Sequence, residues 1–294
     1  MVNFLSNLIN GISLGSVYAI IALGYSMVYG IAKMLNFAHG DVIMVGGYIC
    51  FCGMLYLNLP PLVAVPLAML ACTVLGVLIE GMAYRPLRKA TSLSVLITAI
   101  GVSYLLQNLA LLIWGANPMI FTSVFPKFNL RLMGGELVIS GNAIATVVIT
   151  VVIMILLTVF VGKSKMGKAM RAVSEDRNAA ELMGINVNRV ISLTFAIGSA
   201  LAAIAGVLLC SSYPTLTPTT GSLPGIKAFT AAVFGGIGSI PGAMLGGLLL
   251  GLIEIFGRAY ISSELGDAIV FAVLIIVLLV KPTGLLGKPI REKV

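Results

Sequence analysis

Two short polar stretches interrupt an otherwise apolar sequence, and they hold side chains that could do chemistry inside it. The first, residues 35–41, contains Asn36, the only histidine of the chain, His39, and the carboxylate of Asp41. Ionisable groups inside apolar runs are costly and commonly line a pathway or pair with a partner. In the alternative interpretation, Asn36 and Asp41 cap helices and His39 is a satisfied interfacial residue. One histidine without a chain of carboxylates is poor evidence for proton transfer.

The second stretch, residues 234–242, has the glycine-rich sequence FGGIGSIPG. It aligns with the first, His39-Gly40 on Pro241-Gly242 and residues 45–47 on 245–247, which makes a weak internal repeat. Helices broken by glycine and proline in two halves of a chain present unpaired amides and carbonyls to a solute. The candidate residues of a translocation pathway are therefore Asn36, His39, Asp41, Gly235, Gly236, Gly238 and Pro241.

The other polar groups within apolar runs indicate structural roles. Glu254 and Arg258 are four residues apart, so they share one helix face and can neutralise each other. The sequence offers no His/Glu metal pair and no activated nucleophile, so we predict no metal site, no cofactor and no intramembrane enzyme. Buried thiols, rather than a disulfide framework, are predicted for the four cysteines, which all lie in apolar runs: Cys50, Cys52, Cys72 and Cys210.

The elements that must position these residues follow from the composition. Of 294 residues, 59% are hydrophobic and only 10% are charged, and the mean hydropathy is +1.10. Soluble domains carry about 25% charged residues, so a catalytic soluble domain is excluded. The apolar runs predict an all-α, polytopic membrane protein with about eight transmembrane helices plus broken or re-entrant segments. Residues 226–256 form either a re-entrant pair of half-helices or one broken span plus one full span.

Glycines also recur at the spacing of close helix packing. Gly11 and Gly15 are four residues apart, as are Gly247 and Gly251. Small residues at this spacing let helix backbones approach closely in lipid. They indicate helix packing within one subunit or, alternatively, an interface between subunits.

The basic residues report the orientation of the chain. Most of the 18 lysines and arginines fall in three groups, at residues 85–89, 163–189 and 281–293, each just beyond an apolar run. This is the positive-inside pattern of cytoplasmic loops, so the net charge of +8 indicates a multi-pass inner-membrane protein rather than nucleic-acid binding. The N-terminus is then expected on the extracytoplasmic side.

Residues 163–189 form the one long polar stretch of the chain. They predict a short amphipathic helix that another protein grips or that lies on lipid headgroups. Gly162-Lys163-Ser164 looks like the end of a phosphate-binding loop, but that motif requires glycine where this chain has Leu157. The energy source must therefore be a partner or an ion gradient. The apolar face of the helix combines Met166, Met170, Val173 and Ala180.

Residues 178–184, NAAELMG, are similar to the E-A-A-x-x-x-G loop of ABC importer permeases, with Asn178 in place of the usual glutamate. The whole chain resembles the permeases of branched-chain amino-acid ABC importers. The motifs that carry this resemblance include NFAHGD at 36–41, RPLR at 85–88, MRAV at 170–173, GGIGSIPG at 235–242 and PTGLLG at 282–287.

The resemblance implies one permease domain over residues 1–294 with a cytoplasmic coupling segment at 163–189. It implies transport of leucine, isoleucine or valine, with a second permease, two cytoplasmic ATP-binding subunits that hydrolyse ATP, and an extracytoplasmic solute-binding protein as partners. Urea, an amide or another small polar solute is the alternative cargo, and a stand-alone secondary transporter is a further alternative. The residues expected to couple to the ATPase are Arg171, Asp176, Asn178, Ala179, Ala180 and Gly184.

Overall fold

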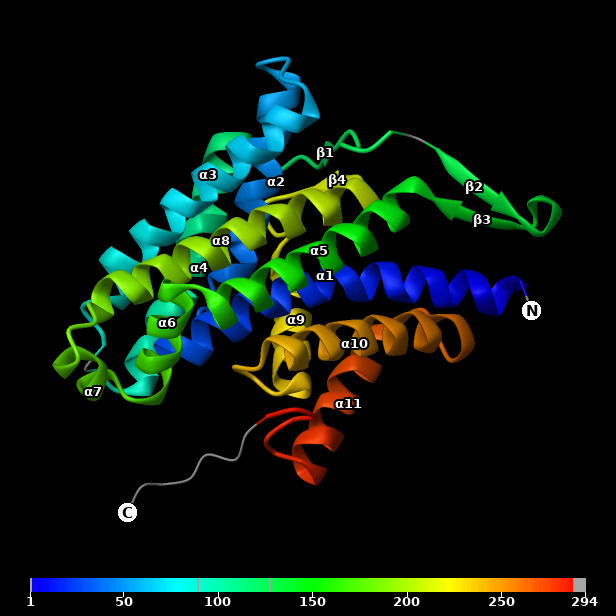
Figure 1. Cartoon of the computed structure of the whole chain (residues 1–294). Helices are drawn as coiled ribbons and strands as arrows, with labels where there is room; N and C mark the ends of the chain where they lie inside the picture. The colour runs from blue at the N-terminus through cyan, green and yellow to red at the C-terminus, as the bar shows by residue number, and fades with distance from the viewer. Residues whose placement is uncertain (1, 89, 127, 288–294) are drawn as a thin grey trace.

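The computed structural model describes residues 2–88, 90–126 and 128–287, which fold almost entirely into helices (Figure 1). The helices are α1 (Val2–Ala32), α2 (His39–Leu55), α3 (Pro61–Ile79) with a π-helical turn (Glu80–Tyr84), α4 (Ser92–Trp114), α5 (Gly141–Lys163), α6 (Lys165–Glu175), α7 (Arg177–Leu182), α8 (Val187–Ser212), α9 (Ser222–Gly235), α10 (Ile240–Tyr260) and α11 (Gly266–Val280). The strands are β1 (Met119–Ile120), β2 (Asn129–Leu132), β3 (Leu137–Ser140) and β4 (Thr215–Leu216).

The described helices agree with the predicted all-α, polytopic membrane fold. Within the described residues, six helices are long and apolar enough to cross a membrane: α1, α3 with its π-helical turn, α4, α5, α8 and α10. The apolar helices α2 and α11 are shorter, with 17 and 15 residues. The run at 226–256 consists of the 14-residue α9 followed by the full-length α10, so it is one short helix plus one full span. The prediction of about eight helices plus broken segments is confirmed.

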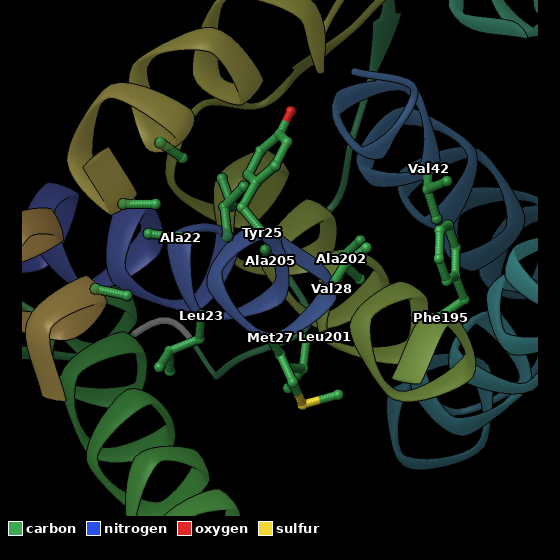
Figure 2. Close-up of a cluster of buried hydrophobic side chains, with 14 of the residues drawn as sticks. Ala22, Leu23, Tyr25, Met27, Val28, Val42, Phe195, Leu201, Ala202 and Ala205 are labelled. Carbon is green, nitrogen blue, oxygen red and sulfur yellow. The ribbon is translucent and has the colours of Figure 1, made fainter. Parts of the chain in front are cut away.

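Helix α1 is the centre of the bundle. In its most apolar stretch 89% of the residues are buried, against 17% for α4 and for α5, whose apolar faces point outward. It packs against α8 and α5 on one side and against α10 and α9 on the other (Figure 1). Side chains of α1, α2 and α8 form the main apolar core, including Val28, Val42, Phe195 and Ala202 (Figure 2).

The predicted glycine pairs make a close contact between α1 and α10. Gly15 lies against the backbone of Gly247 and Leu248, and Gly251 lies against the backbone of Gly11 and Gly15. A side chain at any of these glycines would overlap the facing backbone, so only glycine permits this separation of the helix axes. The glycine spacing therefore reports packing within one subunit.

The two ends of the bundle differ. At one end, β2 and β3 form an antiparallel hairpin with Asn129 opposite Ser140, and β1 pairs with β4. The N-terminus lies near this hairpin end, whereas α6 and α7 project from the opposite end (Figure 1). The sequence analysis predicted a single amphipathic helix at this α6–α7 end. That prediction is wrong, because two helices are present. Asp176 leaves the helical conformation, and its carboxylate accepts hydrogen bonds from the amides of Asn178 and Ala179, which starts α7.

Candidate functional site

The first polar break is the connection between α1 and α2. Its Asn36 is buried, and the side-chain carbonyl accepts a hydrogen bond of 2.9 Å from the hydroxyl of Tyr84 in the π-helical turn. The N-cap of α2 is Ala38, and no side chain caps it. Asn36 therefore links two segments of the chain, and the alternative in which it caps α2 is wrong.

His39 is the first residue of α2, and its ring packs against α1 and α8. Its imidazole is 1% exposed and lies against the edge of the Tyr25 ring, 4.6 Å between ring centres. A Cβ added at Gly24 of α1 would lie 2.5 Å from Nε2, and Gly198 of α8 faces the same ring. Nε2 has no hydrogen-bond partner among the described residues. The surroundings of His39 are those of a packing residue that fills a space left by glycine.

Asp41, two residues later, joins a polar cluster instead. Its carboxylate accepts a hydrogen bond of 2.9 Å from Nε2 of Gln107 on α4, which also lies 3.2 Å from the hydroxyl of Ser222 and 3.3 Å from that of Ser103. Asp41 is buried, while Gln107, Ser103 and Ser222 are half-buried. We call these four residues the Asp41 cluster. It unites α2, α4 and the first residue of α9.

The second break lies between α9 and α10. Gly236 and Gly238 have φ angles of 105° and 93°, which only glycine adopts readily, so the chain can turn back on itself there. Pro241 stands in the first turn of α10, which is capped by the hydroxyl of Ser239. The carbonyl of Gly235 at the end of α9 accepts a hydrogen bond from the amide of Leu286. The chain after α11 thus closes the end of α9.

Both breaks lie against the same half of α1. His39 contacts Gly24, whereas the amide of Gly238 donates to the hydroxyl of Ser26 at 2.8 Å and its Cα faces Gly30. The internal repeat is visible in this arrangement, because the aligned residues His39 and Pro241 each stand in the first turn of a helix, α2 and α10. Gly46 in α2 and Gly246 in α10 each pack against a neighbouring backbone.

The predicted coupling residues form an exposed surface on α6 and α7. Asn178, Ala179 and Gly184 are exposed, whereas Ala180 is buried and anchors α7. Gly184 has a φ angle of 80°, and no atom lies within 4 Å of a Cβ placed there. Leu182 and Met183 are 88% and 82% exposed beside them. The predicted coupling residues include neither Leu182 nor Met183. Two large apolar side chains before a glycine in a polar segment could have identified them from the sequence.

Two arginines join this surface to the breaks. Arg177 of α7 donates to the carbonyl of Ala32, the last residue of α1, and burial followed by the charge of Arg88 lowers the pKa of its guanidinium. Arg171 of α6 donates to the carbonyl of Gly162 at 3.0 Å. It also lines a cavity of about 80 Å³ together with Gly238. The structure thus brings together Arg171 and the second break, which the sequence did not associate.

A cluster of buried charges was only half predicted. Arg258 pairs with Glu254 at 2.7 Å, which confirms the expected structural pair. Lys227 of α9 also donates to Glu254, at 2.8 Å, and to Asp267 of α11, at 2.6 Å. The hydroxyl of Tyr18 donates to Glu254 as well. Lys227 was missed because its partners come from helices that only the fold brings together.

The cysteines are all free, and three of them, Cys50, Cys72 and Cys210, are buried. Within the described residues no group of three or more His, Cys, Asp or Glu side chains is arranged to hold a metal ion.

Comparisons with known proteins agree with this arrangement. A chain of the solved structure of PsaBC from Streptococcus pneumoniae in complex with Fab has a similar fold, with a TM-score of 0.50 and 16% identity over 93% of this chain and 91% of that one. The high-affinity branched-chain amino acid transport system permease protein BraD of Pseudomonas aeruginosa is 48% identical over 99% of this chain and 98% of its own length. LivH of Escherichia coli, described in the same words, is 47% identical over the same shares. The profile of the family described as "branched-chain amino acid transport system / permease component" matches residues 7–278, so the chain belongs to this permease family.

Proposed function

We propose that this chain is the membrane-spanning permease subunit of an ATP-driven importer that translocates leucine, isoleucine and valine. The observation that carries the proposal is the 47–48% identity, over 99% of the chain, to permeases named for high-affinity branched-chain amino acid transport. The solute is a zwitterion with an apolar side chain. Helix ends and the Asp41 cluster offer partners for its charged groups, and the spans offer apolar walls.

The proposed importer contains a second permease, two ATP-binding subunits and an extracytoplasmic solute-binding protein. This chain forms one permease domain, and its segment of 163–189 is too short to make an ATPase. The exposed Leu182 and Met183 suit a protein contact, because large apolar side chains gather at interfaces. The basic residues around α6 and α7 support a cytoplasmic position for this end, and therefore an extracytoplasmic N-terminus in the inner membrane.

The contacts of α6 and α7 suggest how motion reaches the solute pathway. We infer that ATP binding closes the ATPase pair and moves α7. Arg177 holds the end of α1 just before the first break, so a displacement of α7 pulls on this connection. Arg171 borders the cavity next to Gly238, so α6 acts on the second break. Both breaks then move together, which is what alternating access between two permeases requires.

Within the pathway, the Asp41 cluster is the better candidate for solute contact than His39. Gln107, Ser103 and Ser222 are half-buried at the outer side of the bundle, where the second permease would lie, while His39 is enclosed by its own chain. The carboxylate of Asp41 suits the ammonium group of an amino acid. The solute-binding protein would do most of the selection.

The test is reconstitution of the complete importer in proteoliposomes with its solute-binding protein. We expect leucine, isoleucine and valine to stimulate ATP hydrolysis and to accumulate, and urea or acetamide to do neither. Stimulation by urea or an amide alone would replace the proposed cargo by the alternative one. Uptake by this chain alone, driven by an ion gradient, would replace the importer by a secondary transporter.

A further inference from the structure

A groove of about 440 Å³ lies at the α6–α7 end of the bundle, between the ends of α3 and α8. Its polar wall is formed by Arg85, Asn186, Asn188 and Arg189, and its apolar wall includes Val77 and Ala196. It is separate from both breaks and from the exposed residues of α7. None of the roles assigned above uses it.

The groove is positively charged, and its charges are not neutralised by acidic side chains of the described residues. Arg85 and Arg189 are exposed, and neither guanidinium forms an ion pair within the part of the chain that the structure describes. The carboxylate of Glu80, behind the groove, is occupied by Arg88 and by the hydroxyl of Ser192. Two positive charges therefore face an open cavity without a negative partner.

The walls change from polar to apolar along the axes of α3 and α8. Val77 precedes Arg85 by eight residues and Ala196 follows Arg189 by seven, which is about 10–12 Å along each helix. The arginines thus stand at the end of the bundle and the apolar residues at hydrocarbon depth. Val77 is continuous with the exposed, outward-facing side chains Leu78 and Met82. A molecule that fills this groove needs an anionic head and an apolar tail.

We propose that the groove binds an anionic phospholipid of the cytoplasmic leaflet, with its phosphate between Arg85 and Arg189 and the start of its acyl chains along Val77. Basic pockets between helices on this side of a membrane suit such headgroups. A soluble ATPase does not fit, because the apolar wall reaches into the hydrocarbon region. The assignment of the leaflet rests on the orientation proposed above, whereas binding itself does not depend on transport.

The test measures lipid retention by the purified importer complex in native mass spectrometry, with phosphatidylglycerol and phosphatidylcholine as probes. We expect preferential retention of phosphatidylglycerol, and Arg85→Gln/Arg189→Gln to weaken it by roughly five- to thirty-fold. The matched control is Lys163→Gln/Lys165→Gln, which removes the same charge from exposed residues at the same end of the bundle. The conservative variant Arg85→Lys/Arg189→Lys should keep most of the binding and shows that the complex still folds.

A second arm separates the lipid from a free anion. Val77→Asn leaves the charge unchanged but should weaken phosphatidylglycerol binding several-fold, and millimolar inorganic phosphate should not displace the lipid. Equal binding by the wild type and the Arg85→Gln/Arg189→Gln variant would overturn the proposal, as would an equal loss in the control. Displacement by phosphate, with Val77→Asn unchanged, would mean an anion site without a lipid tail. Failure of transport with intact lipid binding would count only against the proposed function.

Discussion

At the residue scale, His39 and Asp41 show how differently two neighbours in one motif can be used. Both stand in the first turn of α2 and both are buried. His39 meets Gly24 and Gly198, so its ring is held by packing. Asp41 contacts Gln107 and Ser103 of α4, and Gln107 also contacts Ser222, so the carboxylate lies among polar groups. The role of each residue is decided by what faces it.

The packing of His39 can be tested through Gly24. We expect Gly24→Ala to destabilise the permease by about 1–3 kcal/mol, because the added methyl group overlaps the imidazole. The shorter side chain of His39→Asn should restore much of this loss in the double variant. The midpoint of thermal inactivation in detergent measures both effects. Gly101→Ala, on the open face of α4, is the matched control and should be neutral or slightly stabilising.

His39 also provides a test of pH dependence. If the ring only fills space, the His39→Asn variant should take up solute with the same pH profile between pH 5 and 8 as the wild-type importer. Uptake into proteoliposomes at fixed internal pH measures this. A pH dependence that is present in the wild type and absent from the variant would assign the imidazole to the pathway.

Gly184 tests the proposed contact of α6 and α7 with the ATPase. Gly184→Leu should abolish solute-stimulated ATP hydrolysis while membrane insertion is retained, because it adds bulk to an exposed contact and a side chain at a positive φ angle. Gly184→Asn separates the two causes, since asparagine tolerates this conformation. Normal stimulation in Gly184→Leu would show that this residue does not face the ATPase. Gly162→Leu, which adds the same bulk on a helical residue without a facing atom, is the control.

At the scale of elements, α9 is shorter than the other apolar helices of the bundle and is held by several polar contacts. It has 14 residues, too few to span the membrane, yet it meets the Asp41 cluster at Ser222 and carries Lys227 into the charges of α10 and α11. Its last turn is closed by the segment after α11. A short helix held at several points along its length can shift as a rigid unit, which suits a moving part of a pathway.

Lys227→Met tests whether the ion pairs of Lys227 hold α9 in place. Lys227 and Glu254 are 4% and 1% exposed, so loss of the lysine leaves this buried carboxylate with the partly exposed Arg258 as its cationic partner. We expect a loss of about 3 kcal/mol in stability, and recovery of most of it in Lys227→Met/Glu254→Gln. Thermal inactivation of the purified permease measures both. Arg258→Gln should cost less than about 1 kcal/mol because the arginine is 40% exposed. Equal losses of stability in Lys227→Met and in Lys227→Met/Glu254→Gln would show that the ion pair between these residues does not stabilise the permease.

At the scale of the whole molecule, the bundle consists of enclosed central helices and outer helices with exposed apolar faces. α1 and α8 are enclosed, whereas α3, α4 and α5 turn long apolar faces outward. Such faces must meet lipid or another apolar protein. The half-buried Asp41 cluster is the polar exception beside α4, which favours a partner permease rather than lipid at that place.

Cysteine labelling tests the orientation of the bundle. A cysteine in place of Arg131 on the hairpin should react with a membrane-impermeant maleimide in spheroplasts, because both the hairpin and the N-terminus are predicted outside. Asn178→Cys on α7 should react only after permeabilisation. The native cysteines are buried or half-buried, so the wild-type chain should give little background. The opposite pattern of labelling would invert the proposed topology.

The sequence alone determined the class of this protein, its approximate number of spans and the two places where the helices break. These follow from local rules, because a bilayer requires about 20 apolar residues for each crossing, and clusters of glycine, proline and polar residues between apolar runs mark the places where a helix is interrupted. It also indicated the coupling segment and the pairing of Glu254 with Arg258, since four residues make one helical turn.

Only the tertiary structure decided which polar groups act together. Lys227 reaches Glu254 and Asp267, Gln107 reaches Asp41, and Arg177 reaches the end of α1, across 27 to 145 residues of chain. No local rule predicts such contacts, because they depend on which helices can approach each other closely at their glycines. The physical reason is that in lipid a polar side chain needs a partner, and the partner is supplied by whichever neighbouring helix the packing brings close.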